Sequence, residues 1–290
     1  MMNYRILTDS CCDLTQEMAD MLELGIAPLS VNLEGKEFPN YLDHHALDVK
    51  VIYDKLRGGA MTSTTAANPT LWRDLAEPIL KDGQDVLILA FSSGLSTTCN
   101  AANMAAQELL EEYPERKIVV VDTLCASLGQ GLLVWYVARK RLEGATIEEA
   151  RDYAEALKPQ LCHWFTVDDL YFLKRGGRVS GATAVVGSLL QIKPILHVDD
   201  EGHLISVSKV RGRKASLQAL AAKTEELGIA PETQTMFISH GDCLEDAEYL
   251  ADLLKTKYHV PEVIINHVGP VIGSHSGPGT MALFFLGKNR

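Results

Sequence analysis

The segment "VLILAFSSG", Val86–Gly94, indicates the fold class, because an unbroken apolar run leads directly into a turn of small hydroxyl residues. Two other segments of the first half have the same form: "YRILTDS" (Tyr4–Ser10) and "KIVVVDT" (Lys117–Thr123). Short apolar runs of this kind are typical of strands buried on both faces, as in a parallel sheet. We therefore predict parallel strands at these three places.

Helical patterns separate or follow these strands. They are "PTLWRDLAEPIL" (Pro69–Leu80), the alanine-rich "STTCNAANMAAQELLEEY" (Ser96–Tyr113) and "SLGQGLLVWYVARKRLEG" (Ser127–Gly144). Pro69 is available for a helix start, Gly144 suits a helix end, and a further helix is expected from about Thr146. Alternating strands and helices predict a layered α/β structure.

The second half has a different order. "HWFTVDDLYFLKRGGRVSG" predicts a strand, a helix and a glycine turn, and "KPILHVDDEGHLISVSKVRG" predicts a hairpin around "DDEG". Helices over 214–228 and 245–258 alternate with strands over 235–241 and 262–269. We predict two α/β domains, residues 1–160 and 161–290, with a ligand cleft between them.

The overall composition excludes several classes of function. The 290 residues carry a net charge of -11, which disfavours nucleic acid as a partner. No apolar run reaches the roughly 18 residues of a membrane helix, and the chain enters a strand-like segment without a signal peptide. The six cysteines show no CxxC spacing. We expect a cytoplasmic protein with reduced thiols, without a cofactor and without a metal site; adjacent His44 and His45 are interpreted as a surface loop.

Short polar residues follow the three predicted strands. Ligands of open α/β sheets lie beyond the carboxyl ends of the strands, so these residues are candidates for a site. For Asp9, Ser10 and Asp122, helix capping is the favoured interpretation. "FSSGLSTT", which contains Ser92 and Ser93, has more hydroxyls than one cap requires, and the surplus suggests contacts to an anion or another ligand.

Three further segments are candidates. "MTSTTAANP" contains Thr62 and Ser63, "LKRGGRVSG" ends its basic run at Arg178, and "VIGSHSGPG" places Ser274 and His275 in a turn. Helix capping, a solvated basic turn and a structural turn residue are the respective alternatives. A guanidinium is also the best available clamp for a carboxylate.

The usual catalytic templates are absent from the sequence: there is no Walker A loop, GxGxxG, GxSxG or HExxH. A serine hydrolase or acyltransferase that uses Ser93 and His275 stays open as an alternative, although the nucleophile elbow is missing. A phosphate-binding enzyme that uses the hydroxyl-rich loops also stays open, although no lysine-bearing phosphate loop is present.

Eight segments in one order carry a resemblance to a known family. They are "ILTDSCCDL", "TSTTAANP", "FSSGLSTT", "VVVDTLCAS", "YFLKRGGRVSG", "LLQIKPIL", "KVRGRKA" and "VGPVIGSHSGPGTMAL". From Arg5 to about Phe285 the chain resembles the DegV family of bacterial fatty-acid-binding proteins. It departs from the family at three places. "TSTTAANP" replaces a pattern such as "TSQPS", Thr97 replaces a glycine, and "DSCCDL" replaces a pattern such as "DStaDL".

The resemblance implies a two-domain protein that binds a long-chain fatty acid such as palmitate and has no chemistry of its own. It assigns the carboxylate to Thr62, Ser93, Arg178 and His275, with Ser63, Ser92 and Ser274 as possible additional contacts. It also implies that some members present the acid to a fatty-acid kinase for phospholipid synthesis. The apolar segment "GATAVVGSLLQIKPIL", residues 181–196, is a candidate tunnel wall, and an ordinary core helix is the alternative.

Overall fold

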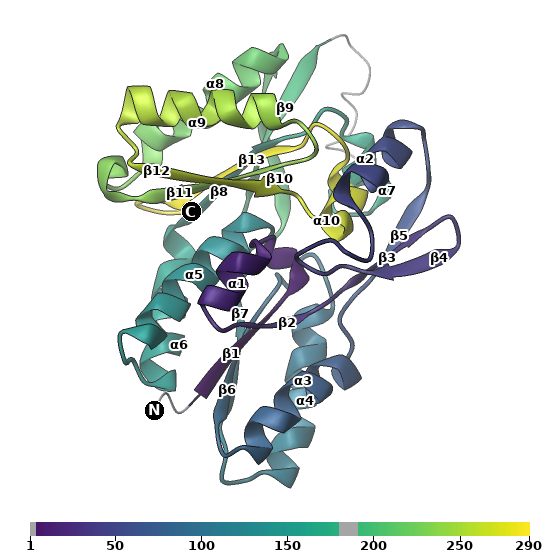
Figure 1. Ribbon diagram of the computed structural model, residues 1–290. Coiled ribbons are helices and arrows are strands. Elements are labelled where there is room, and N and C mark those ends of the chain that lie inside the picture. The colour runs from purple at the N-terminus through teal and green to yellow at the C-terminus, as the bar shows by residue number, and fades with distance from the viewer. Residues whose placement is uncertain (1–3, 180–190) are drawn as a thin grey trace.

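The computed structural model describes residues 4–179 and 191–290, which form three sheets with helices around them (Figure 1). The first sheet is parallel and four-stranded. In spatial order its strands are β2 (Gly25–Ala27), β1 (Tyr4–Asp9), β6 (Asp85–Ala90) and β7 (Ile118–Asp122). Three of these strands confirm the parallel strands predicted from the apolar runs.

Helices cover both faces of this sheet. They are α1 (Gln16–Met21), α3 (Pro69–Lys81), α4 (Thr98–Glu112), α5 (Leu128–Leu142) and α6 (Ile147–Leu157), with a short 3-10 turn at Ser10–Cys12. Helices α3 and α4 bury one face, whereas α5 and α6 bury the other. Local signals set their ends: α3 begins at Pro69 as predicted and is capped by Asn68, Thr146 precedes α6 and forms a capping box, and Gly144 after α5 has φ +99°.

The second sheet is mixed and six-stranded. In spatial order its strands are β10 (Leu204–Arg211), β9 (Ile192–Val198), β8 (Leu161–Thr166), β13 (Met281–Leu286), β11 (Thr235–His240) and β12 (Glu262–His267). The predicted hairpin is confirmed as the antiparallel pair β9–β10, and β11 and β12 are parallel. Figure 1 shows α8 (Arg213–Leu227) and α9 (Leu244–Tyr258) covering the outer face. Short 3-10 turns span Lys158–Gln160 and Pro231–Thr233.

Helix α5 lies between the two large sheets. Its apolar side chains share one core with the inner face of the first sheet and with inner residues of the second. The ring centroids of Trp135 on α5 and Phe237 on β11 are 5.9 Å apart. The division into 1–160 and 161–290 stays a proposal, and the strands support it: those of the first sheet end at Asp122, and those of the second begin at Leu161.

A small antiparallel sheet was not predicted. It consists of β4 (Lys36–Pro39), β3 (Ser30–Leu33) and β5 (Thr62–Thr65), and α2 (Val49–Arg57) packs on it. From the second half, α10 (Pro270–Ser276) also packs on this sheet, and α7 (Tyr171–Arg175) lies beside α10. The small sheet therefore brings segments more than 200 residues apart into contact with each other.

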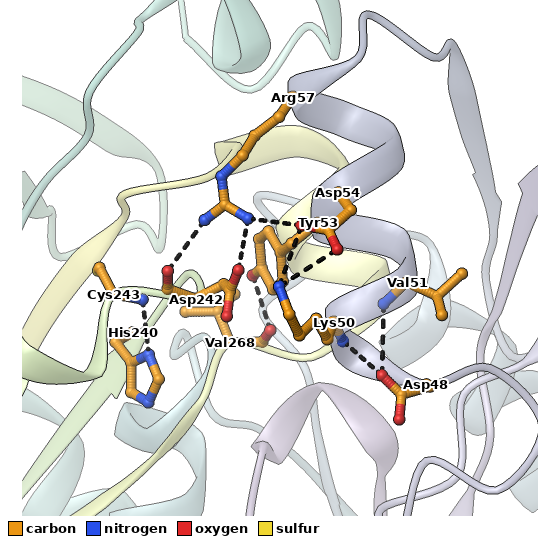
Figure 2. A network of polar contacts seen from close by, with 10 residues as sticks. All are labelled: Asp48, Lys50, Val51, Tyr53, Asp54, Arg57, His240, Asp242, Cys243 and Val268. Carbon is orange, nitrogen blue, oxygen red and sulfur yellow. Dashed lines mark hydrogen bonds and ion pairs between the residues drawn. The ribbon is translucent and has the colours of Figure 1, made fainter.

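Polar contacts join α2 to the second half (Figure 2). The Tyr53 hydroxyl donates to the carbonyl oxygen of Val268 at 2.8 Å, and Arg57 forms an ion pair with Asp242 at 2.5 Å. Tyr53 is fully buried, so its bond is shielded from water. Over residues 4–179 and 191–290, no helix has the length and apolar character needed to cross a bilayer.

Candidate functional site

A cavity of about 440 Å³ lies between the two halves of the chain. Its walls are mainly apolar and include Leu29, Phe91, Phe165, Val198, Ile272 and Phe284. This volume lies within the range of small-molecule sites, which are mostly apolar with a few polar groups that fix orientation. The polar side chains on the wall include Thr64, Ser93, Arg178 and His275, which come from four separate segments.

Arg178 supplies positive charge to the wall. Its Nε and Nη2 atoms donate to the carbonyl oxygen of Leu95 at 3.3 and 3.1 Å, and Nη1 donates to that of Gly176 at 2.5 Å. Among the described residues, no carboxylate forms an ion pair with it. Burial lowers the pKa of Arg178, but a guanidinium stays charged in proteins. A half-buried cation without a counter-ion favours an anionic ligand.

His275, on α10, lines the same cavity as Arg178. Burial, together with the nearby charges of Arg178 and Arg175, lowers the pKa of His275 to about 4. The imidazole is therefore neutral near pH 7 and contributes one donor and one acceptor. Its Nε2 lies 2.8 Å from the Thr64 hydroxyl oxygen, so the two share a hydrogen bond.

The paired glycines before Arg178 have a steric role at this site. A Cβ on Gly176 would lie 2.3 Å from Nδ1 of His275, closer than a side chain can approach. Gly177 has φ +72°, in the left-handed region that favours glycine. The turn "GGR" therefore lets α7 approach α10 and brings Arg178 and His275 to one wall.

The structure brings together three of the four residues assigned to the carboxylate. Ser93, Arg178 and His275 line the cavity, whereas Thr62 does not; its buried hydroxyl oxygen has no hydrogen-bond partner among the described residues. Thr64, two residues further along β5, lies on the cavity wall instead of Thr62. Thr62 and Thr64 share one face of the strand, and recognising β5 as a strand would have presented both as candidates.

The possible additional contacts lie elsewhere. Ser63 is exposed, the Ser92 hydroxyl donates to the carbonyl oxygen of Gly202 at 2.9 Å, and the Ser274 hydroxyl donates to that of Pro270 at 2.8 Å. None of these three residues is on the cavity wall. Ser96, one of the surplus hydroxyls of "FSSGLSTT", is on the wall, and so is Ser276, which the sequence did not single out.

The residues interpreted as capping groups do bond to the backbone. Asp9 accepts from the amides of Cys11 and Phe91 at 3.0 and 2.7 Å, and the Ser10 hydroxyl accepts from Leu29 at 3.0 Å. Asp122 accepts from the amide of Ser93 at 3.2 Å. These bonds hold the loops after β1, β6 and β7, so Asp9, Ser10 and Asp122 position the site without lining it.

Two other sequence expectations concern metals and thiols. His45 pairs with Asp43 in an exposed loop, and the described part of the chain contains no group of three side chains suited to a metal ion.

Burial raises the pKa of Cys11 and of Cys12 well above the ordinary thiol value, which is the opposite of an activated thiolate. Of the candidate tunnel wall, residues 181–190 lie outside the described residues.

Comparisons with known proteins place the chain in one family. A family model described as "Uncharacterised protein, DegV family" matches residues 3–288. A DegV domain-containing protein of Clostridium perfringens is 45% identical over 290 residues, covering 100% of this chain and 99% of the relative.

Solved structures of DegV family proteins resemble the chain over nearly its whole length. A DegV family protein of Thermus thermophilus, described by its fatty acid binding, is 30% identical with a TM-score of 0.87 and covers 98% of this chain and 99% of its own. DegV of Bacillus subtilis, described as a fatty acid binding protein, is 28% identical with a TM-score of 0.84 over 99% and 100% of the two chains.

Proposed function

Because this chain belongs to the DegV family, we propose that it binds a long-chain fatty acid in the cavity between its two halves. The observation that carries the proposal is the guanidinium of Arg178, which lies on the wall of a mainly apolar cavity and forms no ion pair with a carboxylate among residues 4–179 and 191–290. One cation beside a long apolar wall is complementary to a molecule with one carboxylate and a hydrocarbon tail.

The carboxylate binds at Arg178, His275, Thr64 and Ser93 in this proposal. Thr64 takes the role that the resemblance assigned to Thr62, because its hydroxyl lies on the wall and within 2.8 Å of His275. A carboxylate offers about four acceptor positions, enough for the guanidinium and for two or three neutral donors. Each charge-assisted bond contributes about 1.5–3 kcal/mol.

The tail supplies most of the affinity. Burial contributes about 0.8 kcal/mol per methylene, so a tail of roughly fourteen methylenes contributes on the order of 11 kcal/mol before the cost of association. The polar wall then fixes the orientation of the acid and selects the head group. No cofactor is required for this function.

We further propose that the protein is a carrier without catalysis of its own and acts in the cytoplasm. In that role it presents the acid to a partner such as a fatty-acid kinase, which supplies phospholipid synthesis. The pairing of His275 with Thr64 supports a binding site over a serine hydrolase, since Nε2 is already engaged by a residue other than Ser93. Steady turnover of a nitrophenyl acyl ester that is lost in Ser93→Ala would favour the hydrolase instead.

The experiment that tests binding is extraction of the purified protein with organic solvent, followed by mass spectrometry. We expect a long-chain fatty acid from a bacterial expression host, and a rise in melting temperature when delipidated protein receives palmitate or oleate. Tyr41→Phe, at an exposed position outside the cavity, should bind as the wild type does. A clean extract together with an unchanged melting temperature would contradict the proposal.

A further inference from the structure

Two residues of α10, Ser274 and Ser276, have the same side chain and similar burial but different surroundings. Their exposed fractions are 4% and 5%. The Ser274 hydroxyl donates to the carbonyl oxygen of Pro270, one helical turn earlier, which is the usual bond of a serine inside a helix. The Ser276 hydroxyl oxygen is buried and has no hydrogen-bond partner within residues 4–179 and 191–290.

Ser276 also lies on the cavity wall, directly after His275 in the chain. A buried hydroxyl without a partner is unfavourable, because it loses its bonds to water and gains none in return. Such groups in native proteins call for an explanation, and a ligand in the cavity would supply the missing partner.

Only one other side chain in the described part of the chain combines a place on the wall with an unpartnered buried polar atom. It is His163, whose Nδ1 bonds to the carbonyl oxygen of Leu161 at 2.9 Å. Its Nε2 packs against α5, since a Cβ on Gly129 would lie 2.1 Å away. This close packing leaves little room for a ligand at Nε2 of His163, so Ser276 is the stronger candidate for a contact to a ligand.

We propose that Ser276 is a further ligand-binding residue, whose hydroxyl donates a hydrogen bond to a carboxylate oxygen of the bound acid. This inference rests on the proposed function. It adds a neutral donor beside His275, so that Arg178 supplies the charge while hydroxyls and the imidazole complete the coordination of the two oxygens. A serine donor adds hydrogen bonding without adding charge.

The test compares Ser276→Ala with Ser274→Ala in delipidated full-length protein, using palmitate affinity and the unfolding midpoint of the free protein. Ser276→Ala should weaken palmitate binding about tenfold or more, as expected for loss of a bond to a charged group. It should not lower the midpoint of the free protein, because this hydroxyl forms no bond with any described residue. Ser274→Ala should lower that midpoint and leave palmitate affinity nearly unchanged.

A second variant separates hydrogen bonding from cavity shape. Ser276→Cys keeps a similar side-chain size but is a weak donor, so it should lose nearly as much affinity as Ser276→Ala. Unchanged palmitate affinity in Ser276→Ala, or a midpoint lowered as in Ser274→Ala, would overturn the inference while wild-type binding leaves the proposed function intact. Failure of the wild-type protein to bind palmitate would instead overturn both.

Discussion

In the proposed head-group site, Arg178 supplies positive charge and His275 supplies directional hydrogen bonds. The guanidinium is held by the carbonyl oxygens of Leu95 and Gly176, which orient it without neutralising it. His275 stays neutral, because burial and the neighbouring arginines lower its pKa to about 4. The site therefore offers one fixed positive charge together with directional hydrogen bonds.

The first prediction concerns the coupling between these two residues. Arg178→Ala and His275→Ala should each weaken fatty-acid binding by about 1–3 kcal/mol, the range for losing a charged hydrogen bond. The double variant should lose less than the sum, because in the proposed site both residues bind the same pair of oxygens. Isothermal titration with palmitate measures all three changes. Additive and small effects would instead mean that both residues only shape the turns.

At the scale of elements, helix α10 carries part of the proposed head-group site. It carries His275 and Ser276 and packs on α2, on the small sheet and beside α7. Tyr53 of α2 bonds to the carbonyl oxygen of Val268, just before α10, and a Cβ on Gly273 would lie 2.5 Å from the Tyr53 hydroxyl oxygen. The small sheet and α2 thus form the support on which α10 rests.

The second prediction tests that support. Tyr53→Phe removes a buried hydrogen bond and leaves the carbonyl oxygen of Val268 without this donor, so the free energy of unfolding should fall by about 1–3 kcal/mol. Palmitate affinity should fall as well, because α10 loses an anchor. Chemical denaturation and titration measure the two effects. The exposed Tyr41→Phe serves as the matched control and should change neither quantity; equal behaviour of the two variants would rule out the anchoring role.

At the scale of the whole molecule, a buried carboxyl joins the two halves. Asp13 accepts from the amide of Gly269 at 3.1 Å and from the Ser127 hydroxyl at 2.5 Å, and Ser127 in turn bonds to Ser239 at 2.8 Å. Burial raises the pKa of Asp13 to about 8, against hydrogen bonds that lower it. The folded state therefore holds a proton on this group more tightly than the unfolded chain does.

The third prediction follows from the sign of this shift. Because the pKa of Asp13 is higher in the folded state, its contribution to stability is fully present below the unfolded value near 4 and is lost as pH rises towards 8. Asp13→Asn cannot ionise, and asparagine tolerates the positive φ of 51° at this position. Between pH 6 and 8 the wild type should therefore lose stability relative to this variant, by at most about 1.4 kcal/mol per pH unit.

Denaturation at pH 6, 7 and 8 measures the difference between the two proteins. Asp252→Asn, an exposed change on α9, is the matched control and should parallel the wild type at every pH. A constant gap between the wild type and Asp13→Asn over this interval would show that Asp13 does not titrate there.

The fold class was predictable because its signals are local. Apolar runs such as Val86–Ala90 can be buried only between layers, and caps such as Asn68 and Thr146 fix the ends of helices through bonds a few residues away. The small sheet lacks such a signal, since β3, β4 and β5 have four residues each and β5 consists only of serine and threonine. These strands form because they pair with one another and pack against α10, contacts that come from the tertiary structure.

By itself, the sequence determined the layered α/β architecture, and its ordered motifs indicated the family and segments of the site. Only the tertiary structure decided which side chain of each segment lies on the cavity wall. Thr64 lies there and Thr62 does not, and Ser276 does where Ser274 bonds to its own helix. The physical reason is that a residue's neighbours across a cavity come from distant segments, so its role depends on contacts that no local pattern of the chain contains.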